Sequence, residues 1–274
     1  MVITKFHKPI VSVEWLKRNL DATNLIVLDA SIPKVTEGDS VTNNFCIPQA
    51  RFFDIKNKFS NTSAQFPNTF PSKEQFETEA KNLGINNDSF IVVYDDKGIY
   101  SSPRAWWLFK SFGFNSIAVL DGGLPAWIEA FFPVSQKESY NGEKGNFLAL
   151  ERQGNMLFFD DMQKAVINES HQIIDARSES RFKGLEAEPR EGLRSGNIPN
   201  SINLPFQYLL NDGKMKSENE IRDIFQDFQT VKKPMVFSCG SGITACVLAL
   251  GAELIGENNV SVYDGSWTEY GTLT

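Results

Sequence analysis

The sequence has few of the side chains that bind metals or build disulfide frameworks. Its 274 residues include three cysteines and two histidines. No cysteine pair has the Cys-x-x-Cys spacing of a zinc or redox site, and neither histidine lies near a plausible partner. We therefore expect no metal and no other cofactor. The odd number of cysteines indicates free thiols, as is usual in a reducing compartment.

The sequence also lacks a long hydrophobic run and a cluster of basic residues. No stretch approaches the ~18 continuous apolar residues of a membrane-spanning helix. The segment MVITKFHKPIVSVEWLKRNL has neither the apolar core nor the cleavage site of a secretory signal. The net charge of −7 argues against binding to a phosphate backbone. We expect a cytoplasmic protein that binds neither nucleic acid nor membrane.

One layout of landmarks occurs twice along the chain. Residues 91–123 and residues 235–266 have the same layout. The first segment is IVVYDDKGIYSSPRAWWLFKSFGFNSIAVLDGG and the second is MVFSCGSGITACVLALGAELIGENNVSVYDGS. Each segment reads strand, loop, helix, strand and then Asp-Gly, and LIVLDAS at 25–31 pairs with QIIDARS at 172–178. A repeat of this length, seen twice, predicts duplicated domains at 1–132 and 151–274, joined by a polar linker at 133–150.

Each half alternates short apolar runs with amphipathic helical patterns. The runs at 25–28, 90–94, 173–175, 235–238 and 260–263 are typical of strands. Helices are predicted over 72–83 and 217–228, which begin with the capping boxes Ser72-x-x-Gln75 and Ser217-x-x-Glu220. This alternation predicts an α/β fold, in which each domain is a mostly parallel sheet flanked by helices. Functional sites then lie at the carboxyl ends of strands.

The loop CGSGIT carries the most reactive pattern. Cys239 follows the apolar run MVFS and precedes Gly-Ser-Gly and a predicted helix over 243–255. Gly240 and Gly242 permit a tight turn whose N–H groups face negative charge. An ordinary thiol is only about 3% ionised at pH 7, and a helix dipole supplies only ~0.3 to 1 kcal/mol. We therefore expect the loop N–H groups to provide most of the stabilisation of a thiolate.

A purely structural cysteine is the alternative interpretation of this position, since cysteine after an apolar strand often packs as a small hydrophobic residue. For Cys246, which lies on the same face of the predicted helix, packing is the better interpretation.

The segment FSCGSGITA resembles the active-site loop of the 3-mercaptopyruvate sulfurtransferases of the rhodanese superfamily. The similarity covers nearly the whole chain and includes FFDI at 52–55, LDGG at 120–123, DARSESRFKG at 175–184, EPREGLRSGNIP at 188–199 and YDGSW at 263–267. The resemblance implies two tandem rhodanese-like domains, of which the second is catalytic. It also implies that Cys239 accepts the sulfur as a persulfide. The first domain is then inactive, because Asp95 stands where the second domain has Cys239.

The composition of the loop bears on the sulfur donor. Rhodaneses that use thiosulfate typically place basic residues in this loop, whereas Gly240, Ser241 and Gly242 are neutral. We therefore expect 3-mercaptopyruvate as the donor, with release of pyruvate and a thiol, thioredoxin or cyanide as acceptor. Thiosulfate remains the alternative donor, and a non-enzymatic persulfide carrier is the alternative from another class. Related phosphatases bind phosphate with an arginine at the end of this loop, where the present sequence has Thr244 and Ala245. This difference argues against phosphoryl transfer.

The resemblance further implies the substrate-binding residues. Arg181 and Arg190 match two arginines that hold the substrate carboxylate, although each by itself would more often be a solvated charge. Ser241 is the candidate for stabilising charge as the carbon–sulfur bond breaks. The remaining candidates for substrate contact are Gly240, Gly242, Ile243, Thr244 and, in the first domain, Tyr100, for which a role in the core fits equally well.

One departure from the family concerns Ser241. In some members an aspartate and a histidine that follow the FFDI segment assist this serine. Here FFDIKNKFSNTSAQFP contains no histidine, and Lys56 occupies the acidic position. We therefore do not expect a serine-centred proton relay.

Overall fold

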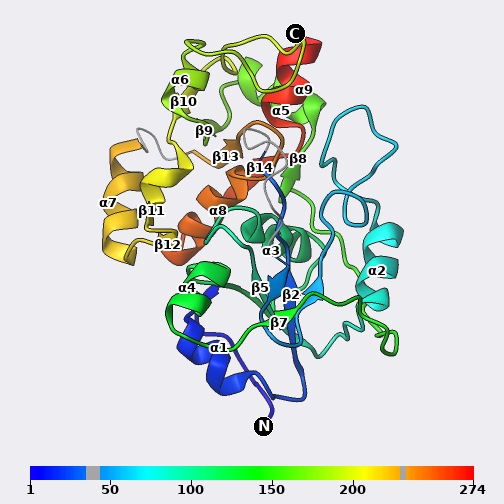
Figure 1. Cartoon of the computed structure of the whole chain (residues 1–274). Coiled ribbons are helices and arrows are strands. Elements are labelled where there is room, and N and C mark those ends of the chain that lie inside the picture. The colour runs from blue at the N-terminus through cyan, green and yellow to red at the C-terminus, as the bar shows by residue number, and fades with distance from the viewer. Residues whose placement is uncertain (35–43, 229–232) are drawn as a thin grey trace. The chain divides into compact units, whose positions relative to one another are not determined.

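The computed structural model describes residues 1–34, 44–228 and 233–274 (Figure 1). Two compact units are present. Unit 1 comprises Met1–Asn61, Phe70–Arg152 and Asp212–Met215, and unit 2 comprises Thr62–Thr69, Gln153–Asn211 and Lys216–Thr274. The predicted linker at 133–150 clusters with unit 1, and each unit takes one short segment from the other half of the chain. The domain boundaries expected from the sequence stay a prediction.

Unit 1 is built on a five-stranded parallel sheet. The strand order is β1-β6-β5-β2-β4, with bounds Ile10–Val11, Ile117–Leu120, Phe90–Tyr94, Leu25–Asp29 and Arg51–Phe52. The inner strands are mostly apolar, with Asp29 at the end of β2 as the exception, because both faces of the sheet are covered. A separate antiparallel pair joins β3 (Phe45–Cys46) to β7 (Ser135–Gln136).

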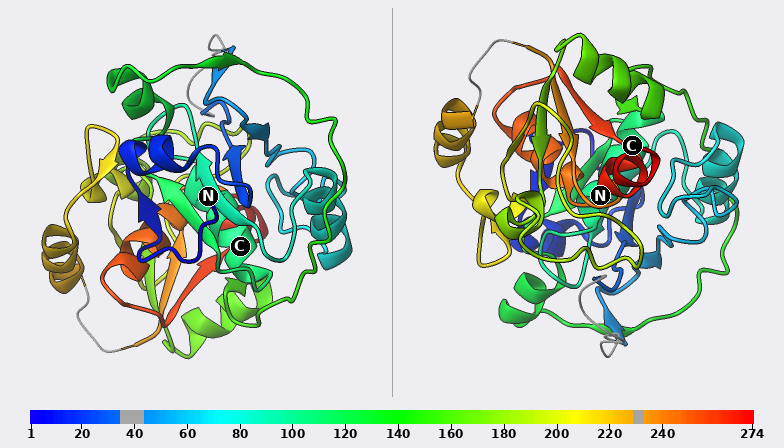
Figure 2. Two further views of the ribbon diagram at one scale, coloured as in Figure 1. Left: turned by 90° about the horizontal axis from the view of Figure 1, so that it is seen from below. Right: turned by 90° about the horizontal axis from the view of Figure 1, so that it is seen from above.

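Helices cover both faces of this sheet. On one face, α1 (Val13–Asn19) and α4 (Gly123–Glu129) place Leu16 and Trp127 in a core with Val92 of β5. On the other side, α2 (Lys73–Asn82) meets α3 (Ser102–Ser111), where the rings of Phe76 and Phe109 lie 5.0 Å apart. Figure 2 shows α1 and α4 on the opposite side of the sheet from α2.

Unit 2 repeats the same architecture. Its parallel sheet has the order β10-β9-β13-β14-β8, with bounds Ser201–Asn203, Gln172–Asp175, Met235–Ser238, Val260–Tyr263 and Met156–Leu157. When this strand order is reversed, each strand occupies the position of its counterpart in unit 1, and β13 corresponds to β5. The predicted duplication of a parallel α/β fold is therefore confirmed.

The helices of unit 2 also form two layers. α5 (Phe159–Ile167) and α9 (Ser266–Leu273), seen side by side in Figure 1, pack Met162 and Trp267 against Val236 of β13. On the other face, Phe225 of α7 (Glu218–Phe228) meets Phe237 of β13, and α8 (Ala245–Leu254) follows the Cys239 loop. The remaining elements are α6 (Glu179–Phe182), the 3₁₀ helix η1 (Phe206–Leu209), β11 (Leu210–Asn211) and β12 (Lys214–Met215), the last belonging to unit 1.

The predicted helix starts are close to the observed ones. Ser217 and Glu220 make both hydrogen bonds of a capping box at the start of α7. Ser72 caps α2 as predicted, but the Gln75 side chain donates to carbonyl groups of the preceding loop and does not complete the box. The helix predicted to begin at residue 243 begins at Ala245, because Gly242 has a φ of +73° and prolongs the loop.

Candidate active site

Cys239 lies directly after β13, at the centre of the unit 2 sheet. Its side chain is buried, with 2% of the residue exposed. β13 is paired with β9 on one side and with β14 on the other, and Ser238 is in register with Asp175 at the end of β9. The cysteine therefore stands at the carboxyl edge of a parallel sheet, as predicted, where neighbouring loops can converge on one atom.

Ser266, the first residue of α9, anchors both ends of the Cys239 loop. Its Oγ accepts hydrogen bonds from the N–H groups of Cys239 and Gly242, each at 3.1 Å, and donates to the carbonyl of Tyr263 at 2.9 Å. The same Oγ lies 3.9 Å from Cys239 Sγ. Ser266 is fully buried and has a φ of +50°, a conformation that few residues other than glycine adopt. The loop is thus held by a strained serine that the sequence did not single out.

Further contacts fix the carbonyl groups of the loop. The N–H groups of Trp267 and Thr268 donate to the carbonyls of Cys239 and Gly240, both at 3.0 Å. The thiol of Cys246 donates to the carbonyl of Gly242 at 3.3 Å and is fully buried, in keeping with a structural role. The N–H of Gly242, which the sequence predicts to face negative charge, donates to Ser266 Oγ.

Both predicted arginines lie against this loop. A methyl group added at Gly240 would stand 3.1 Å from Arg181 Nη2 and 3.8 Å from Arg190 Nη1. Arg190 Nη2 also donates to Ser241 Oγ at 3.1 Å. Because Gly240 has no side chain, the two guanidinium groups can approach the backbone next to Cys239. The structure therefore brings Arg181 and Arg190 together at Gly240. The binding of substrate by the two arginines stays a prediction.

Glu188 holds the Arg181 guanidinium in place. Its Oε2 lies 2.5 Å from Arg181 Nη2, and its Oε1 accepts a hydrogen bond from Arg177 Nη1 at 2.7 Å. Arg177 in turn forms a local ion pair with Asp175, at 2.7 Å between Nη2 and Oδ2. Burial lowers the pKa of Arg177, but hydrogen bonds and charge from Asp175 and Glu188 outweigh burial and raise it. Sequence reasoning missed Glu188, although it stands two residues before Arg190.

Trp267 provides a platform for two arginines. The guanidinium carbon of Arg177 lies 4.9 Å from the centre of the Trp267 ring, and that of Arg194 lies 4.5 Å away. Arg194 also donates to Thr274 Oγ1 at 2.9 Å. Arg194 therefore packs against α9.

Ser241 Oγ accepts two hydrogen bonds. One comes from Arg190, and the other from Asn68 Nδ2 at 3.0 Å, which also lies 3.3 Å from the Ser241 carbonyl oxygen. Asn68 belongs to unit 2 and has a φ of +60°, a conformation that asparagine tolerates. Sequence reasoning missed Asn68, because the family pattern points to a histidine after FFDI and 173 residues separate Asn68 from Ser241.

The other predicted site residues are less closely tied to the chemistry. Ile243 is buried, and Thr244 occupies the N-cap position of α8. Tyr100 lies in unit 1, where its N–H donates to Asp95 and the Lys34 ammonium stands 5.8 Å from its ring centre. Contact of these residues with substrate stays a prediction.

The loop of unit 1 that corresponds to the Cys239 loop surrounds its own carboxylate. Asp95 is fully buried and accepts hydrogen bonds of 2.7–3.0 Å from the N–H groups of Lys97, Tyr100, Ser101 and Ser102 and from Ser102 Oγ. A loop at this place in the fold can therefore present several N–H groups to a negative charge. In unit 1 an aspartate, which cannot accept sulfur, occupies the centre of the loop.

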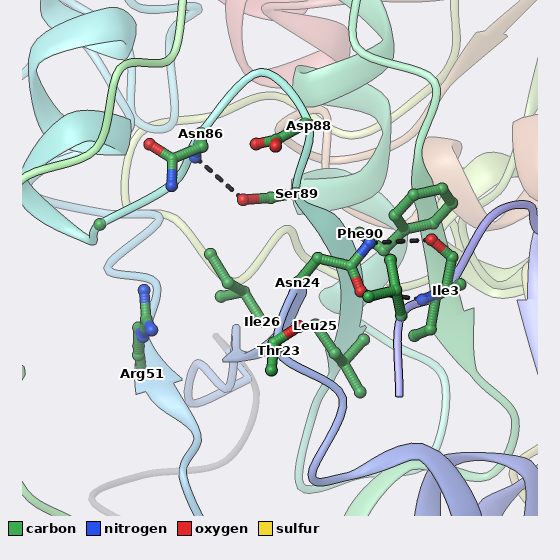
Figure 3. A pocket seen from close by; sticks show the side chains of 12 residues that line it. Ile3, Thr23, Asn24, Leu25, Ile26, Arg51, Asn86, Asp88, Ser89 and Phe90 are labelled. Atoms are coloured by element: carbon green, nitrogen blue, oxygen red, sulfur yellow. Dashed lines mark hydrogen bonds between the residues drawn. The ribbon is translucent and has the colours of Figure 1, made fainter.

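Unit 1 contains a hollow of about 600 Å³ (Figure 3). It is lined by residues at the start of β2 and β5, including Leu25 and Phe90, and by Arg51. These are the amino ends of parallel strands, whereas ligands of such sheets bind at the carboxyl ends. The hollow contains none of the predicted site residues.

Several further features of the described chain bear on the chemistry. Cys46, Cys239 and Cys246 are all free thiols. Within residues 1–34, 44–228 and 233–274, no group of three or more His, Cys, Asp or Glu side chains is placed to hold a metal ion. None of the helices in these ranges has the length and hydrophobicity needed to cross a membrane.

The fold and the cysteine loop match one family of proteins. The description "Rhodanese-like domain" fits residues 12–130 and 159–272, which together make up most of the chain. The chain therefore belongs to the rhodanese family, and it contains two copies of the family's domain. The resemblance inferred from the sequence is confirmed.

Relatives of known activity extend over nearly the whole chain. The 3-mercaptopyruvate sulfurtransferase of Mus musculus is 37% identical over 98% of this chain and 94% of its own length. The thiosulfate sulfurtransferase of Rattus norvegicus is 35% identical with the same coverage. Among solved structures, the 3-mercaptopyruvate sulfotransferase SseA from Escherichia coli aligns with a TM-score of 0.84 at 31% identity, covering 95% of this chain and 99% of its own.

Proposed function

We propose that this protein transfers sulfur from 3-mercaptopyruvate, through a persulfide on Cys239, to a thiol, thioredoxin or cyanide. The observation that carries this proposal is the approach of Arg181 and Arg190 to the neutral loop that follows Cys239. Mercaptopyruvate is an anion with a carboxylate beside a ketone, and guanidinium groups bind such oxygen pairs well. The names of the relatives, which include sulfurtransferases for this donor, support the same reaction.

The first half-reaction breaks the carbon–sulfur bond of the donor. The Cys239 thiolate attacks the substrate sulfur, and a sulfur–sulfur bond forms as the carbon–sulfur bond breaks. The electron pair of the broken bond passes to the carbon side and leaves as the enolate of pyruvate, which takes a proton to give pyruvate. The Cys239 persulfide remains, and in the second half-reaction its outer sulfur passes to the acceptor.

Each residue near Cys239 has a part in this scheme. Arg181 and Arg190 hold the carboxylate, and Gly240 leaves the space through which they reach the loop. Ser241 donates a hydrogen bond to the oxygen on which enolate charge develops. In the described structure the side chains hydrogen-bonded to Ser241 Oγ are those of Arg190 and Asn68, and no histidine is among them. We therefore assign the proton for the enolate to water.

Thiosulfate is the second candidate donor. It is favoured by the similarity to thiosulfate sulfurtransferases and to plant enzymes named for both donors. The neutral loop argues for mercaptopyruvate, because a dianion gains more from basic residues within the loop.

Two further expectations belong to the same proposal. The first domain, placed at 1–132, has no activity of its own, because Asp95 stands in place of the cysteine. A cytoplasmic location is supported by the three free thiols, since disulfides persist mainly in oxidising compartments.

The deciding experiment compares the two donors and detects the intermediate. The kcat/KM for mercaptopyruvate, measured by release of pyruvate, is expected to exceed that for thiosulfate. Mass spectrometry after a single turnover is expected to find one added sulfur atom on the peptide containing Cys239. A higher kcat/KM for thiosulfate would overturn the choice of donor. Failure with both donors, together with loading of sulfur from a protein partner, would indicate a carrier.

A further inference from the structure

Ser241 has an unusual set of hydrogen-bond partners. A serine hydroxyl has one hydrogen to donate and two lone pairs that accept. Both groups that reach its Oγ, Arg190 Nη2 at 3.1 Å and Asn68 Nδ2 at 3.0 Å, are donors. An arginine guanidinium has no acceptor atom, so this contact has only one direction.

The orientation of the Asn68 amide is determined by the loop backbone. Besides Ser241 Oγ, its Nδ2 lies 3.3 Å from the carbonyl oxygen of Ser241. A carbonyl oxygen only accepts, so the side of the amide that faces the loop must be the nitrogen. Asn68 therefore donates to Ser241 and does not accept from it.

The hydroxyl hydrogen of Ser241 is left for another acceptor. Within the part of the chain that the structure describes, Ser241 Oγ donates to no protein atom, and its two lone pairs are engaged. Hydrogen bonds that a hydroxyl accepts polarise it and strengthen the one that it donates. The arrangement presents the Ser241 O–H, next to Cys239, to whatever acceptor binds there.

We propose that Asn68 is a positioning residue that, together with Arg190, makes Ser241 an obligate hydrogen-bond donor to the substrate. This inference rests on the proposed function and deepens it, because the acceptor it implies is a ketone oxygen that becomes an enolate. Asn68 has no ionisable side chain and cannot take the Ser241 proton. The role of Ser241 is then to stabilise charge without transferring its proton.

The test reverses or removes the Asn68 donor. Asn68→Asp has nearly the same shape but only accepts, so the Ser241 hydrogen turns toward the carboxylate and away from the substrate. Asn68→Gly removes the side chain without strain at a φ of +60°. We expect kcat for mercaptopyruvate to fall about 3- to 10-fold in Asn68→Gly, and about tenfold further in Asn68→Asp.

The Ser241→Ala background separates this role from simple support of the loop. Without the hydroxyl, Asn68→Gly and Asn68→Asp should have kcat values within about twofold of each other and of Ser241→Ala alone. If Asn68→Asp and Asn68→Gly still differ in kcat in the absence of the Ser241 hydroxyl, the new carboxylate acts directly on the substrate charge. That result would overturn the inference. Equal losses of kcat in both variants in the wild-type background would overturn it as well.

Asn200 provides the matched control. It is exposed, and its φ is also +60°. Asn200→Gly and Asn200→Asp should leave kcat and KM within twofold of wild type. If wild-type protein releases no pyruvate from mercaptopyruvate, the proposed function fails and this inference fails with it. If wild type is active and the Asn68 variants behave as the Asn200 variants do, only the inference fails. If Asn68→Asp proves unstable, Asn68→Gly alone tests the inference. It should lower kcat in the wild-type background and leave kcat unchanged within about twofold in the Ser241→Ala background.

Discussion

The carboxylate of Glu188 joins Arg181 to Arg177, with oxygen–nitrogen distances of 2.5 Å and 2.7 Å. One guanidinium lies against the Cys239 loop, and the other is buried against Asp175. The position of a residue predicted to bind substrate therefore depends on a carboxylate that cannot itself bind an anion.

Removing this carboxylate should affect both substrate binding and folding. In Glu188→Gln we expect kcat/KM for mercaptopyruvate to fall roughly 10- to 100-fold, because Arg181 loses its support. Stability should fall by about 3 to 5 kcal/mol, because Arg177 loses one of its two buried carboxylate partners. Steady-state kinetics and urea unfolding measure the two effects. Glu191→Gln, an exposed neighbour, should change neither, and a fully active Glu188→Gln would contradict the role assigned to Glu188.

The two cysteines of unit 2 near the loop should differ sharply when replaced. Cys239→Ser should release no pyruvate from mercaptopyruvate, because a serine hydroxyl cannot carry the sulfur. Cys246→Ser should keep activity, with a loss of stability of about 1 kcal/mol, since its contact with the Gly242 carbonyl can be kept by a hydroxyl. Pyruvate release and thermal unfolding are the measurements. Activity in Cys239→Ser would show that the nucleophile lies elsewhere.

The two arginines should govern the use of substrate. Arg181→Lys and Arg190→Lys keep the charge but lose the planar donor pair, and we expect kcat/KM to fall roughly tenfold or more in each. Arg190→Lys also loses the Nη2 contact with Ser241, so its kcat should fall as well as its KM rise. Arg222→Lys on the exposed side of α7 is the control. Wild-type kinetics in both site variants would rule out the clamp.

Ser266 should be needed for the shape of the reactive loop. In Ser266→Ala the buried N–H groups of Cys239 and Gly242 lose their shared acceptor, and stability should fall by about 2 to 4 kcal/mol. The rate of Cys239 alkylation by iodoacetamide at a fixed pH should fall with it. Ser266→Gly removes the strain of the positive φ but not the loss of the acceptor, so it should recover part of the stability and none of the reactivity. Ser261→Ala, another buried serine of unit 2, should leave alkylation unchanged.

Asp95 should matter for stability only. Asp95→Ala leaves the buried N–H groups of Lys97, Tyr100, Ser101 and Ser102 without their acceptor. We expect a loss of about 2 to 4 kcal/mol in urea unfolding and, at a temperature where the protein stays folded, kcat within twofold of wild type. Asp88→Ala, which is exposed in unit 1, should affect neither. A specific loss of sulfur transfer in folded Asp95→Ala would contradict an inactive role for this loop.

The class of fold and the position of the candidate nucleophile could both be predicted from the order of residues. Short apolar runs such as MVFS are typical of buried strands, glycines mark the turns that follow them, and a repeat along the chain is visible without coordinates. Cys239 could be located because the features that mark it are adjacent to it in the chain. The strand before it and the glycine loop after it are local features.

The hydrogen-bond partners of the cysteine loop became known only from the folded structure. Asn68 and Ser266 are ordinary polar residues in their own segments, and they reach Ser241 and Cys239 across 173 and 27 residues of chain. Glu188 reaches Arg181 within one segment, but only the fold of that segment brings the two side chains together. Hydrogen bonds act over about 3 Å and carry no signal in local periodicity or propensity. The identity of the donors to Ser241 was therefore set by the meeting of three separate segments, which no single stretch of sequence encodes.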